Sequence, residues 1–550
     1  MNFKMIKYTL GLILLFESAF LAVPLITSFF YIREEWSAAL SVLGAMLICA
    51  AAGLLLSYKK PKNMALSSKD GFVTVALSWI VLSLFGSLPF LFSGAIPNFI
   101  DALFETVSGF TTTGSSVVSN VSELPKTILM WRSFTHWVGG MGVLVFIMAI
   151  FPLSGARNMH IMRAESPGPA VSKLVPRVKR TALILYAIYF VMTLIQFILL
   201  LFGDMTPFEA LNTAFATAGT GGFGIRNDSL FSFSAYSQII VTVFMLLFSV
   251  NFNAYYLLIN KKIKEALNSE IKLFFGIVLT AVGIITVSLL AASGANGMSF
   301  GETLRHAAFS VASIISTTGF STLDFNLWPT IAKVTIVALM FIGACAGSTG
   351  GGFKVSRIII LFKGMIREVG SVISPRRVKK ITLDGKAVSH EVTRSVNAYL
   401  VTYVLIFAVS FFLISFDGYA VTEGSKLVTN FTAVAATVNN IGPGLDMVGP
   451  AVNYSFFNPF SKLVLIFDML AGRLELLPML LLFSPSLWAD GIRQHFPKKI
   501  KAAADNAEDE TSEEDERFEE ADTEESSANS EPADGETSAD EALKSEPADG

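Results

Sequence analysis

The sequence predicts an all-α membrane protein built from four repeats of helix, short re-entrant segment and helix around a common axis, with two further transmembrane helices in front. Three observations predict this fold. The 550 residues are 52% hydrophobic and only 15% charged, which is too apolar for an ordinary soluble protein. Ten apolar stretches approach the roughly 20 residues that cross a bilayer as a helix. A weakly apolar segment that leads into a glycine recurs four times.

The transmembrane helices are predicted where the apolar stretches lie. These stretches are 8–31, 38–56, 72–92, 128–152, 182–202, 239–259, 271–292, 331–362, 396–416 and 463–482. The first is longer than the apolar core of a signal peptide and lacks a clear cleavage site, so we interpret it as a retained helix. Ten crossings put both termini on one side. Lys and Arg are retained in cytoplasmic segments, and the basic clusters at 59–62, 177–180, 261–264 and 376–380 all fall on that side. Both termini are therefore predicted to be cytoplasmic.

The acidic residues are distributed unevenly along the chain. The last 48 residues hold 20 of the 44 acidic groups and two of the 41 basic ones, and their Glu, Asp, Ser, Ala and Thr content predicts a disordered acidic tail at 503–550. The outer segments carry 13 acidic and 8 basic residues, a balance that would attract cations, although the retention of Lys and Arg inside explains about half of it. No basic stripe indicates a nucleic-acid partner. Two cysteines are too few for a disulfide framework.

The four re-entrant segments lie between successive apolar stretches. They read DALFETVSGFTTTG at 101–114, EALNTAFATAGTGG at 209–222, HAAFSVASIISTTG at 306–319 and TNFTAVAATVNNIG at 429–442. Each is too short to cross the bilayer, so it enters and leaves on the same face. The final glycines are spaced by 108, 97 and 123 residues. One segment alone could reflect close helix packing by small residues, but four equivalent copies indicate a shared function.

The end of each segment offers backbone oxygens and no ionisable side chain. Non-helical backbone at membrane depth is tolerated where it is packed in protein or lines a water-filled path, and glycine permits the positive φ that turns carbonyls toward an axis. Four such segments would form a ring of carbonyl oxygens that replaces the hydration shell of a monovalent cation, whereas a divalent cation would require carboxylates. The predicted ion ligands are the backbones of Thr112, Thr113, Gly114, Thr220, Gly221, Gly222, Thr317, Thr318, Gly319, Asn440, Ile441 and Gly442.

A glycine-rich stretch, GACAGSTGGG at 343–352, interrupts the eighth apolar stretch. Its glycines are Gly343, Gly347, Gly350, Gly351 and Gly352. At about 1 kcal/mol of helix preference lost per glycine, the segment should unwind. It could obstruct a pore below the carbonyl ring, or it could be a simple kink for packing. A phosphate-binding loop is excluded because Lys354 is followed by Val355 rather than by Ser or Thr.

Arg473 stands within an apolar helix, where an arginine costs at least about 2.5 kcal/mol and therefore faces protein or water rather than lipid. Its charge could project toward the permeation path, or it could form a structural ion pair with Asp468 or Glu475. Glu17 and His136 are lone polar groups that helix–helix hydrogen bonds account for. Glu105 and Glu209 are expected to sit at the heads of the first two re-entrant helices.

The chain resembles the Trk/Ktr/HKT superfamily of potassium transporters. Besides the four segments, the resemblance rests on WRSFTHWVGGMGV at 131–143, GSTGGGFK at 347–354 and GRLE at 472–475, and it covers about 63–497. It implies four helix–pore loop–helix repeats around a central, potassium-channel-like pore, and the leading helix pair points to the TrkH branch. The implied domains are an N-terminal extension at 1–62, pore repeats at 63–180, 181–270, 271–395 and 396–502, a gating loop at 343–353 within the third repeat, and the tail at 503–550.

The resemblance also implies a function, namely potassium uptake across the cytoplasmic membrane without covalent chemistry or a cofactor, with potassium as substrate. In sodium-carrying relatives the first filter glycine is often serine, whereas this chain has Gly114. The resemblance further suggests that 343–353 and Arg473 control flux. It implies a homodimer in contact with membrane lipid and a cytoplasmic nucleotide-binding regulator of the TrkA type, for which 367–394 is a candidate docking surface. A sodium-permeable or cation-coupled symporter of the same superfamily is the alternative. An enzyme is disfavoured because the chain lacks clustered intramembrane acid and base side chains.

Overall fold

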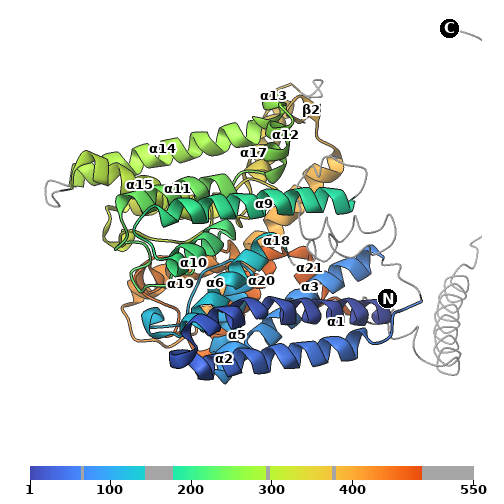
Figure 1. Cartoon of the computed structure of the whole chain (residues 1–550). Coiled ribbons are helices and arrows are strands. Elements are labelled where there is room, and N and C mark those ends of the chain that lie inside the picture. The colour runs from blue at the N-terminus through green and yellow to red at the C-terminus, as the bar shows by residue number, and fades with distance from the viewer. Residues whose placement is uncertain (63–66, 143–177, 293–297, 375–379, 486–487, 489–550) are drawn as a thin grey trace, which may run out of the picture. The chain divides into compact units, whose positions relative to one another are not determined.

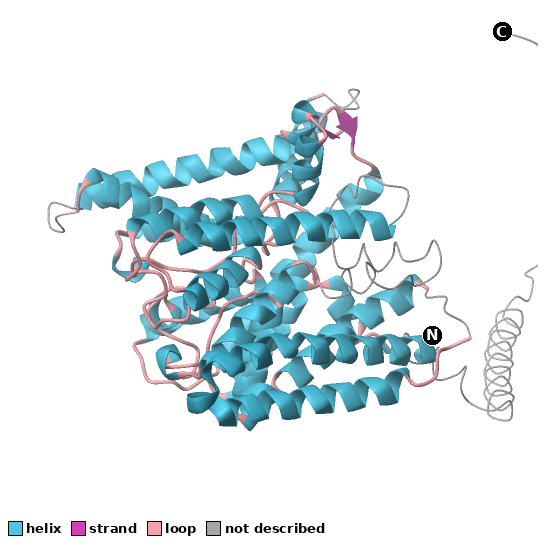
Figure 2. Ribbon diagram, viewed as in Figure 1, coloured by secondary structure: helices cyan, strands magenta, loops and turns pink. Residues whose placement is uncertain are grey.

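The structure is a computed structural model that describes residues 1–62, 67–142, 178–292, 298–374, 380–485 and 488. The predicted tail at 503–550, the second half of the predicted span 128–152 and most of the basic cluster 376–380 lie outside the described residues. The described helices form one compact unit, Met1–Leu487. Figure 2 shows that this unit is almost entirely helical. A single two-stranded antiparallel pairing, β1 (Thr382–Leu383) with β2 (Lys386–Ala387), accompanies the helices of the described chain.

Two N-terminal helices precede the repeats, as predicted. Helix α1 (Phe3–Phe20) packs along α2 (Ala22–Ser57), and both are blue in Figure 1. The packing is close because glycines face each other: a Cβ added to Gly53 would lie 2.9 Å from the Gly11 carbonyl oxygen. Helix α2 is kinked at Tyr31 and Glu35. Beyond the kink, the Glu35 carboxylate accepts hydrogen bonds from the backbone N–H groups of Lys126 and Thr127, at 2.7 and 2.9 Å.

The rest of the unit repeats one pattern four times: a long helix, a short helix and a second flanking helix. The first copy comprises α3 (Ser68–Gly86), α4 (Leu88–Phe92), α5 (Phe99–Phe110), the 3-10 turn η1 (Val121–Glu123) and α6 (Lys126–Gly140). The second comprises α9 (Val178–Leu201), α10 (Pro207–Ala218), α11 (Ala235–Phe248), α12 (Phe252–Ile259) and α13 (Ile263–Ala266). The third comprises α14 (Ser269–Ala292), α15 (Phe300–Ile315), η3 (Phe325–Leu327), α16 (Thr330–Ile342) and α17 (Val355–Ile373). The fourth comprises α18 (His390–Ile414), α19 (Glu423–Val438), η4 (Asp446–Val448), α20 (Pro459–Arg473) and α21 (Leu477–Leu481).

The short helices α5, α10, α15 and α19 are the predicted re-entrant helices. They contain 12 to 16 residues, so at 1.5 Å per residue they fall short of a roughly 30 Å hydrocarbon layer. Each begins at a polar cap whose side chain accepts backbone N–H groups of the first turn: Asn98, Thr206, Ser299 and Thr422. In α10 and α15 the glutamates Glu209 and Glu302 complete capping boxes.

The expected position of Glu105 at the head of its helix is wrong. Glu105 lies in the middle of α5, where it is fully buried. Its carboxylate pairs with the buried guanidinium of Arg132, with 2.5 Å between Oε1 and Nε. The first turn of α5 instead carries Asp101. Glu105 is thus held by a buried ion pair between α5 and α6 rather than by a helix N-terminus. Its partner, Arg132, is 27 residues away in the chain, so the local sequence could not reveal it.

The second helix is interrupted in the second, third and fourth repeats. Helix α6 ends at Gly140, α16 at Ile342 before the glycine-rich stretch, and α20 at Arg473 before the short α21. The predicted span at 239–259 is sharply bent, because α11 and α12 meet at an angle of 91°, although the pair is long and apolar enough to count as one broken span. Within the described chain, six helical segments are long and apolar enough to span a membrane by length and composition: Phe3–Tyr31, Glu35–Ser57, Lys69–Phe92, Ala182–Leu201, Ser269–Ala292 and His390–Ile414.

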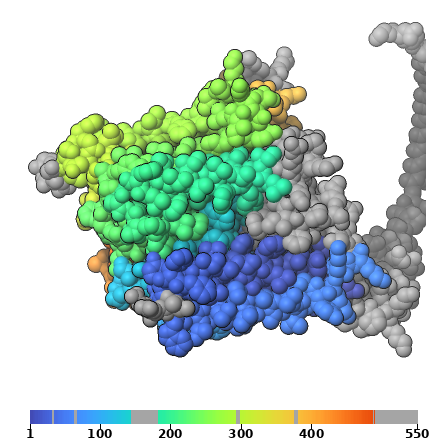
Figure 3. All heavy atoms as spheres, viewed as in Figure 1, coloured from blue at the N-terminus to red at the C-terminus, as the bar shows by residue number. Residues whose placement is uncertain are grey.

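The outward faces of the long helices are apolar. Figure 3 shows one face of the molecule, formed mainly by the N-terminal helices in blue and by the second and third repeats in green. Large aliphatic side chains on these helices are strongly exposed, among them Leu55 on α2 at 75% and Leu279 and Val287 on α14 at 72% and 68%. Such surfaces are unusual on a soluble protein. They are what the hydrocarbon of a bilayer covers in a protein of several membrane-spanning helices.

Candidate functional site

The four re-entrant helices end in loops of the same backbone conformation. The residue two positions before each loop glycine has a left-handed φ: 56° at Thr112, 55° at Thr220, 60° at Thr317 and 53° at Asn440. The glycines themselves have φ of 84° at Gly114, 76° at Gly222, 86° at Gly319 and 104° at Gly442. Glycine adopts such values at little cost. The same pattern of two left-handed positions therefore recurs at the end of each re-entrant helix.

The loops meet one another in cyclic order. A Cβ added to Gly114 would collide with the carbonyl oxygen of Gly221 in the second loop. The corresponding collisions join Gly222 to Thr318, Gly319 to Ile441, and Gly442 back to Thr113, where the distance would be 2.9 Å. Each glycine is therefore pressed against the carbonyl that precedes the glycine of the next loop. Four such contacts close a ring, and all twelve filter residues predicted from the sequence lie in it or next to it.

The fourth loop keeps the backbone conformation although its side chains differ. Asn440 donates hydrogen bonds from Nδ2 to Thr113 Oγ1 in the first loop and to the Met469 carbonyl oxygen of α20, both at 2.9 Å. The carbonyl of Gly442 accepts from the hydroxyls of Tyr454, at 2.7 Å, and of Ser115, at 3.1 Å. The asparagine amide thus replaces the threonine hydroxyl by reaching two neighbouring elements. Tyr454, which lies in an outer loop, is a contributor that no sequence motif indicated.

A cavity of about 180 Å³ lies beside the ring. Residues of all four repeats line it, including the four loop glycines. Arg132 and Arg226 also line it, and each is paired with a carboxylate, Glu105 at 2.5 Å and Glu209 at 2.6 Å. Partial burial of Glu209 disfavours its charged form, but hydrogen bonds from Thr206 and Arg226 outweigh this and lower the pKa of Glu209 below its ordinary value. Positive and negative charges are therefore balanced beside this mouth.

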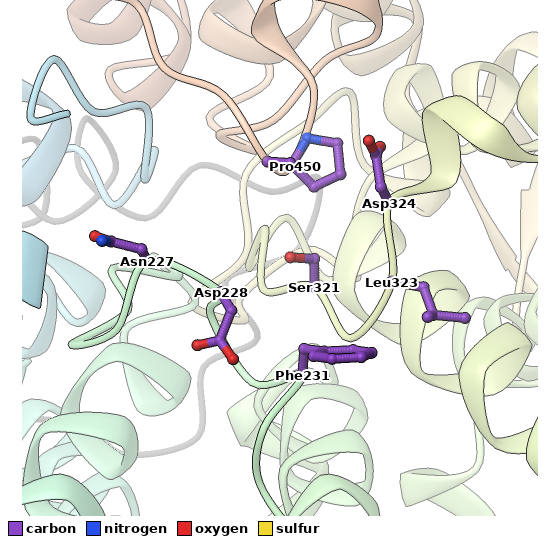
Figure 4. Close-up of a pocket in the computed structure, with 8 residues that line it drawn as sticks. Asn227, Asp228, Phe231, Ser321, Leu323, Asp324 and Pro450 are labelled. Carbon is purple, nitrogen blue, oxygen red and sulfur yellow. The ribbon is translucent and has the colours of Figure 1, made fainter. Parts of the chain in front are cut away.

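A second cavity of about 350 Å³ lies between loops of the second, third and fourth repeats (Figure 4). The carboxylates of Asp228 and Asp324 and the ring of Phe231 line it, together with Pro450. Asp324 also accepts the backbone N–H of Asn326 and so caps η3. Most other outer carboxylates have structural partners as well, for example Asp101 with Lys462 at 2.6 Å. The predicted acidic surplus outside is thus largely a set of helix caps and ion pairs.

The glycine-rich stretch 343–352 is non-helical, as predicted, and lies directly against the ends of the third and fourth re-entrant helices. The Gly351 N–H donates to Thr317 Oγ1 at 2.6 Å. A Cβ added to Gly350 would lie 2.8 Å from the Ser316 carbonyl oxygen, and one added to Gly351 would lie 2.5 Å from that of Asn439. Gly343, Gly347 and Gly352 have φ of 74° to 76°. The stretch therefore lies immediately beneath the carbonyl ring.

Several elements hold this stretch in place. Its Cys345 N–H donates to the Ser249 carbonyl at 3.1 Å, and its Gly347 carbonyl accepts from the Phe252 N–H at 3.0 Å, so it occupies the break between α11 and α12. The Glu270 carboxylate, at the start of α14, accepts the N–H groups of Ala346 at 2.7 Å and of Ser356 at 3.1 Å. Glu270 thereby joins the stretch to the first turn of α17. Its position in an apolar helix is the only sequence signal that could have indicated it.

Arg473 reaches across the same region. Its guanidinium donates to the Thr349 carbonyl of the glycine-rich stretch at 2.9 Å, and to the carbonyls of Gly139 and Gly140 at the end of α6, at 2.5 and 2.9 Å. The two carboxylates suggested as its ion-pair partners have other partners: Glu475 pairs with Arg357, and Asp468 accepts from Ser410 at 2.6 Å. Arg473 therefore connects the glycine-rich stretch to the first repeat through backbone carbonyls.

The chemistry of the site is that of neutral backbone oxygens. Among the described residues, no group of three or more His, Cys, Asp or Glu side chains could hold a metal ion. A ring of carbonyls suits a monovalent cation stripped of water. The basic side chains beneath the ring, Lys354, Arg357 and Arg473, are each engaged with carbonyls or a carboxylate. The arrangement resembles an ion site with bound basic side chains on one side of it rather than an acid–base catalytic centre.

Known proteins are similar to this chain in sequence and in fold. The chain is 35% identical over 497 residues to the Trk system potassium uptake protein TrkH of Escherichia coli strain K12, covering 89% of this chain and 100% of that protein. It is 31% identical to TrkG of the same organism, covering 88% and 98%. The crystal structure of the potassium transporter TrkH from Vibrio parahaemolyticus matches with a TM-score of 0.78 at 33% identity, covering 89% of this chain and all of that one. The family model TrkH, described as cation transport protein, matches residues 39–490. The chain therefore belongs to the TrkH family of cation transport proteins, which are transporters rather than enzymes.

Proposed function

We propose that the protein is the ion-conducting subunit of a potassium uptake system. The observation that carries this proposal is the closed ring of four loops, in which each glycine contacts the carbonyl that precedes the next glycine. The same positive φ values recur in all four loops, so the carbonyls present equivalent positions to an ion on the axis. A neutral ring without carboxylates favours a monovalent cation. The names of the TrkH and TrkG relatives support potassium as that cation.

The twelve loop residues predicted from the sequence, 112–114, 220–222, 317–319 and 440–442, form the proposed selectivity filter. Ions enter from the cavity beside the ring, lose water among the carbonyls and leave toward the cytoplasm, driven by the membrane potential. No cofactor takes part, and potassium is the substrate. The proposed domains are the extension at 1–62, the pore repeats at 63–180, 181–270, 271–395 and 396–502, and the tail at 503–550.

The glycine-rich loop is the proposed gate. It contacts the ends of two re-entrant helices directly, and Arg473, Glu270 and Thr317 bind its backbone. A loop rich in glycine has little preference for any helical conformation, so it can move aside at low cost when these contacts break. The guanidinium of Arg473 contributes a positive charge below the filter, which disfavours a second cation there. Flux thus depends on how firmly the loop is held.

The membrane setting and partners follow from the same family assignment. The proposed location is the cytoplasmic membrane, with both termini on the cytoplasmic side and the apolar helix faces in contact with lipid. The relatives are named as members of a Trk system, which supports assembly with further components. We infer a homodimer and a cytoplasmic nucleotide-binding regulator of the TrkA type, for which the segment 367–394 is a candidate docking surface. Residues 375–379 of that segment lie outside the described part of the chain.

Flux in liposomes tests the proposed function. Purified protein is reconstituted into vesicles loaded with potassium or with sodium, the membrane potential is clamped, and cation movement is recorded. Potassium flux well above sodium flux is expected. Equal fluxes would favour the sodium-permeable alternative, and flux that requires a proton or sodium gradient in addition to the potential would favour the cation-coupled symporter. The absence of any cation flux from folded protein would contradict the proposal.

A further inference from the structure

The imidazole of His136 connects two repeats behind the proposed filter. It lies on α6, one turn before the glycines that end this helix, and its side chain is fully buried. The imidazole Nδ1 is 2.8 Å from the Gly109 carbonyl oxygen of α5, in the first repeat. The backbone N–H of Phe223, which directly follows the filter glycine of the second repeat, donates to Nε2 at 3.2 Å. One ring therefore joins the re-entrant helix of one repeat to the filter strand of the next.

The two partners determine the protonation state of the ring. A carbonyl oxygen only accepts and a backbone N–H only donates, so Nδ1 carries the proton and Nε2 carries the lone pair. The imidazole is thus neutral, in a single tautomer, with both nitrogens engaged. A buried polar group that satisfies both of its partners in this way holds them at a defined separation. The Nδ1 hydrogen bond joins the helices α6 and α5, whereas the Nε2 bond reaches the loop backbone directly after the proposed filter glycine Gly222.

The ring also fills the space behind the filter glycines of the second loop. A Cβ added to Gly221 would collide with the imidazole ring, and one added to Gly219 would collide with the backbone of His136. The imidazole lies 4.2 Å from the Phe223 ring, centroid to centroid. Arg132, one turn earlier on the same face of α6, places its guanidinium 3.6 Å from the centroid of that ring and donates to the Gly224 carbonyl at 2.7 Å. One face of α6 thus contacts the segment 221–224 continuously.

We propose that His136 is a positioning residue for ion selectivity, which sets the location of the second filter strand against the first repeat. This inference rests on the proposed function, because it assigns His136 to the same filter. The Gly221 carbonyl lies against Gly114 and the Gly222 position against the Thr318 carbonyl, so a shift of the second strand changes two of the four contacts in the ring. His136 does not touch the ion. It acts through the backbone of Phe223 and the position of Gly221.

The test compares variants by the ratio of potassium to sodium flux. His136→Phe keeps an aromatic ring of similar size and loses both hydrogen bonds, whereas His136→Gln keeps one donor and one acceptor. We expect the phenylalanine variant to lose about tenfold in the flux ratio, equivalent to about 1.4 kcal/mol, and the glutamine variant to regain part of it. His306→Phe is the matched control, because the His306 side chain, on the re-entrant helix α15, is also buried but contacts the Thr322 hydroxyl rather than the filter backbone.

Selectivity is the decisive reading because a merely structural role would lower abundance and total flux without changing the ratio. A phenylalanine variant with the parental flux ratio would overturn the inference. If that variant does not accumulate in folded form, His136→Met provides an apolar side chain of adaptable shape, and equal ratios for the methionine and glutamine variants would overturn it. The parent protein separates the two proposals: a parent without potassium preference contradicts the proposed function, whereas a selective parent with a selective His136→Phe variant contradicts only the role of His136.

Discussion

Replacing Gly114 with serine perturbs the carbonyl ring at one defined contact. An added Cβ would lie about 1 Å inside the 3.0 Å limit of real Cβ contacts, measured from the Gly221 carbonyl oxygen. That atom belongs to backbone, so a side-chain rotation cannot relieve the collision. The φ of 84° adds a conformational cost of about 1–3 kcal/mol for a residue with a Cβ. The first or second loop must therefore move, and the ion meets a distorted ring.

Gly442 provides a graded comparison within the same ring. A Cβ there would lie 2.9 Å from the Thr113 carbonyl oxygen, only about 0.1 Å inside the limit. We expect Gly114→Ser to reduce the potassium-to-sodium flux ratio by about tenfold, which corresponds to about 1.4 kcal/mol of lost discrimination. Gly442→Ser should cause a smaller loss. Gly94→Ser is the control, because Gly94 has a φ of 70° but no atom within 4 Å of an added Cβ.

The assay is flux competition in liposomes, with potassium and sodium supplied together at a clamped potential and with each variant normalised to folded protein. The control variant carries the cost of the positive φ without the collision, so a change shared by Gly94→Ser and Gly114→Ser would reflect general stability. An unchanged potassium preference in folded Gly114→Ser protein would refute the carbonyl-ring reasoning. A larger loss at Gly442 than at Gly114 would refute the ordering of the contacts.

Three further predictions concern the gate and the outer mouth. Arg473→Ala removes three hydrogen bonds to backbone carbonyls and a positive charge beneath the filter, so potassium flux should rise about tenfold; unaltered flux in folded protein would leave Arg473 a purely structural role. Glu270→Ala releases the N–H groups of Ala346 and Ser356 and should also raise flux. Glu265→Ala, which removes an exposed ion pair with Lys262, should not raise it. Equal flux in the two variants would contradict the role of Glu270 in holding the glycine-rich loop. The lowered pKa of Glu209 means that the ionised side chain contributes stability above its ordinary pKa of 4.5 and loses it as pH falls below that value. The difference in thermal unfolding temperature between the parent and Glu209→Gln should therefore shrink on acidification, and a constant difference would contradict the ion pair with Arg226.

Local sequence patterns were sufficient to predict the four repeats. Apolar stretches of membrane length and caps such as Thr206 and Ser299 depend on residues near in sequence, so helices and their approximate starts could be predicted. Glycine at a positive φ is likewise a local requirement, which is why Gly114 and its three equivalents could be recognised as a recurring loop position. The unwinding of 343–352 followed from helix propensity alone.

Other features depend on partners that are distant in sequence. The span 239–259 has the hydropathy of one helix, yet the backbone groups of Ser249 and Phe252 bond to the glycine-rich loop almost 100 residues later, and the helix breaks. Glu105 was expected to be a cap because its sequence position suits one, and only the fold brings Arg132 to it. The partners of Arg473 were equally hard to predict, since the backbone carbonyls of two separate segments, at 139–140 and at Thr349, have no side-chain signature.

The sequence by itself thus determined the membrane setting, the repeat and the uncharged character of the proposed ion path, because hydropathy, helix propensity and glycine conformation are properties of short segments. The tertiary structure alone decided how the loops close into a ring, which groups hold the loop beneath it, and that His136 joins two repeats behind the filter. These depend on hydrogen bonds to backbone atoms, and every residue carries the same backbone atoms. Their partners become visible only when the chain is folded.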